Sequence, residues 1–336
     1  MIKKILKCES NPYVTMYHNV AFPLSIIQGN ANQDITPWIC GRYINCMYDE
    51  NSRNNQFNIC IDDEWGNVDG ALSVQSISVD RDVIERLSVK YVDILKSLIN
   101  QNCYPNGGYN EEYIPGKKSY RQQYHKHDFL LTGYDDKQEV FYSVGYLNNN
   151  SYSEYEISYS DMEDSLKSIK DDRLKFLFFK FNEGVDFSCL NIKKIHNELV
   201  EYVNCYTTHI KNCHNQYFGF EAIKRLRVHI LEKVQDKDID LRFTKGFWEH
   251  KKMMYLRLDY LCKLGFISSE LVDASEAVLK KAELVHLLAI KYLITQSDSL
   301  IRRICNHLDD SIEMETKYLP EFIRCLKNYL PEVDNE

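Results

Sequence analysis

One histidine stands at the entrance of a predicted strand and is the residue best suited to acid–base chemistry. His127 precedes the apolar run FLLTGY, residues 129–134, and an Asp-Asp-Lys turn follows that run. A histidine at the start of a strand is held rigidly by the sheet, so its imidazole can face a nucleophile that another element presents. Because imidazole titrates near neutral pH, such a group can take a proton from a thiol and later return it to a leaving group.

The run from His127 to Asp135, HDFLLTGYD, resembles the histidine motif of papain-like cysteine peptidases that process bacteriocin leaders. It resembles more closely their relatives in peptide-antibiotic gene clusters, the family of the butirosin-pathway acyltransferase and the closthioamide amide synthetase. Residues 217–226 and 247–261 are similar to the helical region that follows the catalytic half in these relatives. The resemblance implies a nucleophilic cysteine, His127 as the general base, and an Asp or Asn on the next strand that orients the imidazole.

The cysteine that this resemblance implies is missing from its expected place. A papain-like enzyme holds it at the N-terminus of the first helix, where the helix dipole and the histidine favour the thiolate. Here that helix is predicted within residues 15–29, and Ala21 is the position expected for the nucleophile, with Tyr17 one turn earlier. Three explanations are open. The chain is a homologue that has lost its chemistry, Ala21 is an engineered cysteine-to-alanine change, or Cys40 or Cys46 reaches the histidine in another register.

The third member of the implied triad is also displaced. Its place in the run VFYSVGY, residues 140–146, falls near Gly145, which has no side chain to orient an imidazole. Asn148 lies just beyond and can take this role only if the strand ends early. We therefore predict a catalytic site formed by His127, the Ala21 position and Asn148.

We expect no metal and no cofactor. Cys205, His209 and Cys213 recur at four-residue steps, and cysteine and histidine are zinc ligands. On a helix, however, the third residue has rotated roughly 80° away from the first, so the three do not easily reach one ion. Their default interpretation is core or surface residues.

The elements that position these residues change character near residue 160. Before it, short alternating runs broken by turn residues predict strands, and two stretches have helical spacing. The glycine- and proline-bearing stretch 104–118, which leads into the histidine strand, is expected to be a loop. The predicted strands cover 69–79, 129–146 as a hairpin, and 153–160, and the predicted helices lie near 21–29 and 81–100.

After residue 160 the apolar spacing is helical almost throughout, which predicts about six helices. They cover roughly 191–212, 217–234, 247–261, 271–292, 299–309 and 313–329. The predicted fold class is therefore α+β, with helices packed on an antiparallel sheet over 1–160 and an α-helical bundle over 161–336. The resemblance implies that the first of these is a papain-like domain.

Charge and composition argue against several classes of function and partner. The formal charge of −8 and the pI of about 5.7 argue against nucleic-acid binding, which needs a concentrated basic surface. No apolar run reaches the length of a membrane span, and the one at the N-terminus is too short for a signal peptide. We expect a cytoplasmic bacterial protein whose 11 cysteines are free thiols.

Two functions of different classes follow from the resemblance. The first is a papain-like acyltransferase or amide synthetase of antibiotic, non-ribosomal peptide-type biosynthesis. It would move an acyl group from the phosphopantetheine thioester of an acyl or peptidyl carrier protein to an amine substrate. The second is a catalytically inactive homologue that binds a carrier protein or a peptide in the old cleft. A processing peptidase ranks third.

Overall fold

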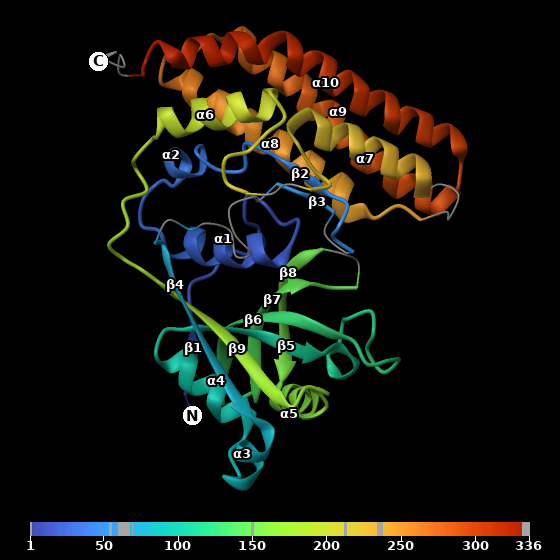
Figure 1. Ribbon diagram of the computed structural model, residues 1–336. Helices are drawn as coiled ribbons and strands as arrows, with labels where there is room; N and C mark the ends of the chain where they lie inside the picture. The colour runs from blue at the N-terminus through green and yellow to red at the C-terminus, as the bar shows by residue number, and fades with distance from the viewer. Residues whose placement is uncertain are drawn as a thin grey trace. The chain divides into compact units, whose positions relative to one another are not determined.

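The computed structural model describes residues 2–53, 56–59, 68, 70–148, 151–211, 214–233 and 238–330. The chain divides into two units, one of residues Met1–Asn32 and Asn67–Val185, the other of Gln33–Gly66 and Asp186–Glu336. We call them the sheet unit and the helical unit. The predicted mixed α+β class is confirmed (Figure 1). None of the described helices is both long and apolar enough to cross a lipid bilayer.

The sheet unit is built on a seven-stranded antiparallel sheet. In spatial order its strands are β4 (Leu72–Asp80), β9 (Arg173–Phe181), β5 (Tyr104–Asn110), β6 (Lys126–Asp135), β7 (Val140–Tyr146) and β8 (Tyr152–Ser158), with β1 (Lys3–Ile5) paired to β6. The helices are α1 (His18–Asn30), α3 (Arg81–Arg86), α4 (Tyr91–Asn100) and α5 (Tyr159–Lys167), with a 3-10 turn η1 (Glu111–Tyr113).

Helix α1 is apolar on all sides, and its residues Val20–Ile27 are all buried. It contacts β7 and β9 of the sheet. Gly29, near its end, lies against the chain before it, since a Cβ there would stand 2.6 Å from Cα of Cys8. The helix that begins at His18 is therefore fixed in place along its whole length.

The stretch 104–118, expected to be a loop, instead begins with the strand β5 at the centre of the sheet. β5 pairs with β6 on one side and β9 on the other, and nearly all of it is buried. Its glycines serve close packing: a Cβ on Gly107 would lie 3.0 Å from a ring carbon of Phe176. The glycine signal for a loop was thus overridden by tertiary packing.

The sheet also contains β9, a strand in the region after residue 160 that was expected to be helical. Its burial alternates along RLKFLFFKF, as in a strand with one covered face. The predicted boundary at residue 160 therefore differs from the observed division in two respects. The sheet unit continues past that residue to include β9, and residues 33–66 belong to the helical unit.

The helical unit consists mainly of long helices. They are α6 (Ile192–Val203), α7 (Gly219–Lys233), α8 (Leu241–Lys263), α9 (Ser269–Thr295) and α10 (Asp298–Lys327), joined by the short α2 (Thr36–Ile39) and a small sheet of β10 (Gln216–Phe218), β2 (Met47–Asp49) and β3 (Phe57–Asn58). The two helices expected over 299–309 and 313–329 are one, α10. Ser311 between them is buried, and its hydroxyl donates to the His307 carbonyl oxygen of the preceding turn.

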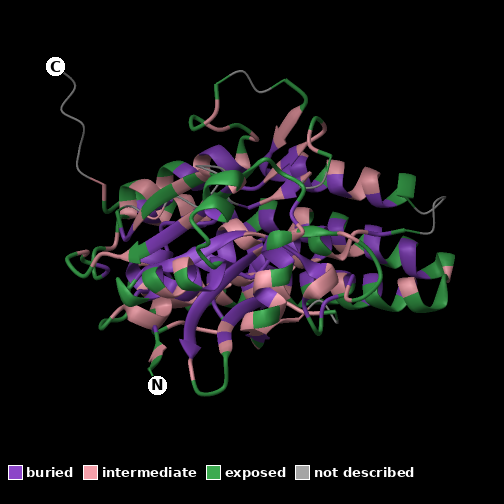
Figure 2. Ribbon diagram, turned by 90° about the horizontal axis from the view of Figure 1, so that it is seen from below, coloured by how far each residue is buried: buried purple, intermediate pink, exposed green. Residues whose placement is uncertain are grey.

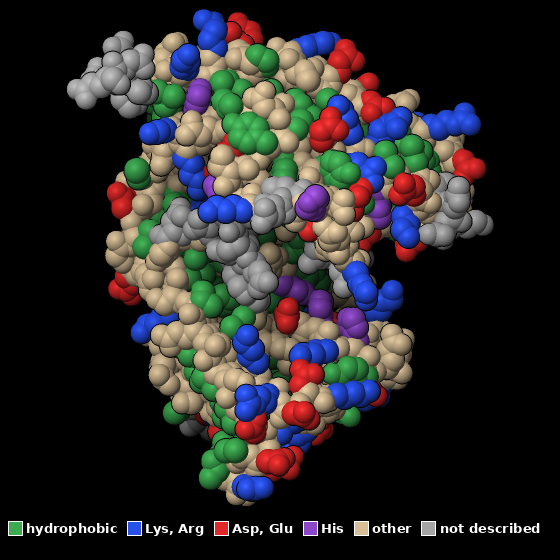
Figure 3. Space-filling view, viewed as in Figure 1, with side chains coloured by type: hydrophobic (Ala, Val, Ile, Leu, Met, Phe, Trp, Pro, Cys, Tyr) green, Lys and Arg blue, Asp and Glu red, His purple; other side chains and the backbone are tan. Residues whose placement is uncertain are grey.

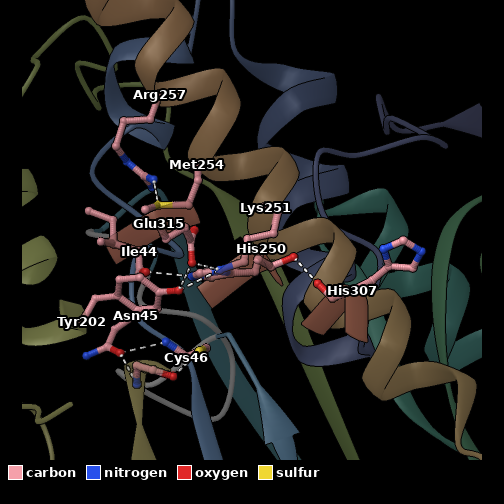
Figure 4. A network of polar contacts seen from close by, with 12 residues as sticks. Ile44, Asn45, Cys46, Tyr202, His250, Lys251, Met254, Arg257, His307 and Glu315 are labelled. Carbon is pink, nitrogen blue, oxygen red and sulfur yellow. Dashed lines mark hydrogen bonds and ion pairs between the residues drawn. The ribbon is translucent and has the colours of Figure 1, made fainter. Parts of the chain in front are cut away.

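Buried polar contacts hold residues 40–44 to α8 and join α8 to α10 (Figure 4). Lys251 Nζ donates to Glu315 Oε2 and to the Tyr202 hydroxyl, each at 2.7 Å, and the two charged side chains are 1% and 0% exposed. His250 Nε2 donates to the carbonyl oxygen of Ile44 at 2.8 Å. Arg257, which is fully buried, donates to backbone carbonyl oxygens at positions 40 and 42.

Candidate functional site

His127 lies at the start of β6, directly opposite Tyr109 of β5. Two residues further along β5, the chain turns into η1, and this turn presents the carboxylate of Glu111. Oε1 of Glu111 lies 2.7 Å from Nδ1 of His127. Because a carboxylate only accepts, Nδ1 carries the proton and donates it, which leaves Nε2 as the basic nitrogen of His127.

The backbone around this pair is fixed by Asn110, the last residue of β5. Its backbone N–H donates to Ser165 Oγ, and its side-chain amide donates to Ser168 Oγ, so both are tied to α5. Its Oδ1 accepts the backbone N–H of His125 at 3.0 Å. The Glu111 backbone N–H in turn donates to the His125 carbonyl oxygen. The two strand ends are therefore locked together where the site lies.

Glu111 is a buried carboxylate that stays charged. Its side chain is 8% exposed, and burial acts to raise its pKa. The hydrogen bond and charge of His127, with the charges of Lys117 and His125, outweigh burial, so the pKa of Glu111 lies below its ordinary value. An ionised carboxylate on Nδ1 fixes the tautomer of His127 and the orientation of its ring.

The residue at the start of α1 that contacts His127 is a histidine. The ring centroid of His18 lies 4.5 Å from that of His127, at an interplanar angle of 62°. The same His18 ring contacts Phe22 of its own helix and Tyr146 at the end of β7. The start of α1 therefore faces the histidine of β6, and the side chain that it presents there is an imidazole.

Ala21, the position expected for the nucleophile, lies one turn inside α1. It is 0% exposed, and its backbone N–H donates to the Tyr17 carbonyl oxygen. Tyr17 is the residue before the helix, so the alternative placement one turn earlier is adjacent to the residue that does contact His127.

Asn148, expected as a low-ranking orienting residue, lies beyond the end of β7 and is exposed. Its backbone N–H donates to the Gly116 carbonyl oxygen. The group that hydrogen-bonds His127 is instead Glu111, from the stretch expected to be a loop. Sequence reasoning missed it because the antiparallel pairing of β5 with β6 was not predicted. Its one signal was an acidic pair, Glu111 and Glu112, shortly before the histidine strand.

The cysteines considered as alternative nucleophiles are enclosed. Cys40 and Cys46 belong to the helical unit and are 0% exposed. Burial is the main cause that raises the pKa of Cys40 to about 11 and that of Cys46 to about 12. In the sheet unit, burial raises the pKa of Cys8, with Glu154 and Glu9 adding to the effect. These three thiols are poor sources of thiolate at neutral pH.

The structure describes only part of the set Cys205, His209 and Cys213 that was considered for zinc binding. Cys213 lies outside the described residues. His209 Nε2 stands 3.9 Å from Glu198 Oε1, so a carboxylate is its neighbour.

Histidine side chains reach the surface together near strands β5–β8, beside acidic side chains (Figure 3). His127 and His125 are 35% and 51% exposed, so their rings are open to solvent, whereas the Glu111 carboxylate beneath them is not. No protein-family model matches the chain, and no curated protein matches its sequence significantly. The site consists of a solvent-open imidazole backed by a buried, charged carboxylate.

Proposed function

We propose that the chain is a papain-like protein of specialised-metabolite biosynthesis, with a helical bundle after its catalytic half. It transfers an acyl group from a carrier-protein thioester to an amine, and His127 and Glu111 are its acid–base pair. The observation that supports this is the 2.7 Å hydrogen bond from Nδ1 of His127 to the buried carboxylate of Glu111. Such a pair provides general acid–base catalysis on its own.

The transfer needs no cysteine nucleophile. Nε2 of His127 takes a proton from the amine as its nitrogen attacks the thioester carbonyl carbon. The C–N bond forms, the C–S bond breaks, and the same proton passes to the leaving thiolate. The products are an amide and the free thiol of the phosphopantetheine arm, so no ATP is consumed. Holding the amine against the thioester supplies most of the remaining acceleration.

The second candidate is a protein that binds a carrier protein or a peptide without turning it over. The observation that favours it is that His18 is the residue of the helix start in contact with His127, while Ala21 and Tyr17, the positions expected for the cysteine, offer no thiol. An acyl-cysteine route is closed at these positions, and a retained cleft without its nucleophile is what an inactive homologue would show.

The decisive experiment offers the full chain a carrier protein loaded with an acyl-phosphopantetheine thioester and a panel of amines. Mass spectrometry follows amide formation. For transfer, we expect amide to form above the rate without protein. His127→Gln should lower the rate on the order of 10²–10⁴-fold, as expected on loss of a general base. Glu111→Gln should lower it less, on the order of 10-fold to 10²-fold, because Nε2 keeps its place.

The matched control is His196→Gln, a histidine of α6 whose Nδ1 lies 3.2 Å from Asn197 Oδ1. It should transfer at the wild-type rate. If the wild type forms no amide but binds the loaded carrier, measured by fluorescence anisotropy, the second candidate replaces the first. Absence of both transfer and binding would exclude both candidates.

A further inference from the structure

Two histidines and one carboxylate converge where β5 and β6 are joined. His125 and His127 are two positions apart on an extended chain, so their side chains share a face. Nδ1 of His127 lies 2.7 Å from Oε1 of Glu111, and Nε2 of His125 lies 4.0 Å from its Oε2. One donor atom from each of the three residues lies within 4.8 Å of the donor atoms of the other two.

We propose that Glu111, His125 and His127 form a binding site for a divalent transition-metal cation of the zinc class. Imidazole nitrogen and carboxylate oxygen are the ligands of such ions, at about 2.0–2.2 Å, which places neighbouring donors of a tetrahedral ion roughly 3.3 Å apart. The observed separation between Glu111 and His127, 2.7 Å, is shorter than this value, and that between Glu111 and His125, 4.0 Å, is longer. Rotation of the half-exposed His125 ring closes the longer one, and the cation takes the place of the proton between His127 and Glu111, so the cation-bound and the hydrogen-bonded forms of this pair are alternatives.

The surroundings of the three residues support a site whose ligands are held from behind. The backbones of Glu111 and His125 are hydrogen-bonded to each other, and Asn110 anchors both to α5. Such outer contacts orient metal ligands and typically change affinity 10–100-fold when they are lost.

Two further side chains modulate the site. Lys117 contributes a positive charge near Glu111 that opposes a cation, but its Nζ donates to the Tyr146 carbonyl oxygen and lies over the Tyr155 ring. His18, in ring contact with His127, carries a further imidazole on the same side. Three ligands from the chain leave one position for solvent or a substrate atom, as in catalytic rather than structural zinc sites.

The test is a titration of the full chain with Co²⁺, a spectroscopic substitute for Zn²⁺. We expect visible d–d absorption that saturates at one ion per chain and disappears when Zn²⁺ is added. The variants Glu111→Gln and His125→Gln should each weaken Co²⁺ binding at least tenfold, and His196→Gln should not change it. Circular dichroism and thermal melting of each variant establish that it is folded.

The inference is overturned if the folded wild type gives no such absorption. It is equally overturned if Glu111→Gln and His125→Gln bind Co²⁺ as the wild type does. This readout involves no thioester and no amine, so it stands or fails separately from the proposed acyl transfer.

Discussion

The two units of the molecule each contain a carboxylate bonded to a nitrogen base at the same distance, 2.7 Å, but in opposite surroundings. In the sheet unit, Glu111 holds His127, whose side chain is 35% exposed. In the helical unit, Glu315 holds Lys251, and both side chains are almost completely enclosed. Buried segments occur in the strands as well as in the helices (Figure 2). The imidazole of the first pair is therefore open to solvent, whereas neither side chain of the second pair is.

This difference separates what each pair can do. A proton, a metal ion or a substrate can reach the imidazole of His127, because only its carboxylate partner is buried. The Lys251–Glu315 pair is closed to solvent; Glu315 Oε2 bonds Lys251 and Tyr202, while Glu315 Oε1 is buried without a hydrogen bond among the described residues. It specifies how α8 and α10 meet, and charged groups of this kind are costly when one partner is removed.

The largest expected effect on the free energy of unfolding comes from removing one partner of the Lys251–Glu315 pair. Lys251→Met leaves Glu315 buried without its cation, and we expect a loss of about 3–5 kcal/mol in the free energy of unfolding. The double variant Lys251→Met/Glu315→Leu removes both charges and should recover most of that loss. Urea unfolding measures both, and a single variant as stable as the wild type would show that the pair is not enclosed as described.

His286 of the helical unit is partly exposed, and we expect its contribution to the free energy of unfolding to be intermediate. Burial, aided by the charge of Lys245, lowers the pKa of His286 to about 4. The folded state thus favours the neutral ring, which lies 2.9 Å from Thr244 Oγ1 and stacks on Trp248. Its contribution is complete above the ordinary value of 6.5 and is lost as the pH falls from there toward 4.

Allowing for the partial exposure of His286, this contribution amounts to about 1–2 kcal/mol. We expect His286→Gln to lose less stability between pH 7 and pH 4 than the wild type by this amount, measured by urea unfolding at each pH. Parallel pH curves for the two proteins would contradict the assignment of the shift to His286.

The smallest effect on stability is expected at the open pair. Glu111→Gln keeps the shape of the side chain and a hydrogen bond to His127, so we expect unfolding to change by no more than about 1 kcal/mol. The same variant should lower the rate of acyl transfer and weaken cation binding, each by at least about tenfold. A loss as large as that of Lys251→Met would mean that the Glu111–His127 pair is primarily structural, and the contrast between the two units would disappear.

The sequence predicted the parts of the fold that local patterns encode. The hairpin of β6 and β7, the helix containing Pro23 and the long α9 follow from alternation, spacing and turn residues. Two helices were expected over α10, whereas the chain continues as one helix with Ser311 buried between the two expected segments.

What could not be predicted depends on contacts between distant parts of the chain. β5 carries two glycines that favour a loop locally, and only its position between β6 and β9 makes it a strand. The same pairing brings Glu111 to His127, 16 residues away. His127 was predicted as the central residue of the site, but its contacts with His18 and Glu111 required the sheet register and the exact start of α1.

The division of the chain into units also fixes an order of events during synthesis. Ile44 and Cys40 leave the ribosome early. The side chains that bind their carbonyl oxygens, His250 and Arg257, follow 206 and 217 positions later. The large sheet has all its strands once β9 has emerged, so the sheet unit can assemble before α8, which binds this early segment, has been synthesised. A chain truncated after residue 185 would contain every strand of the large sheet and would leave that segment without the helices that bury it.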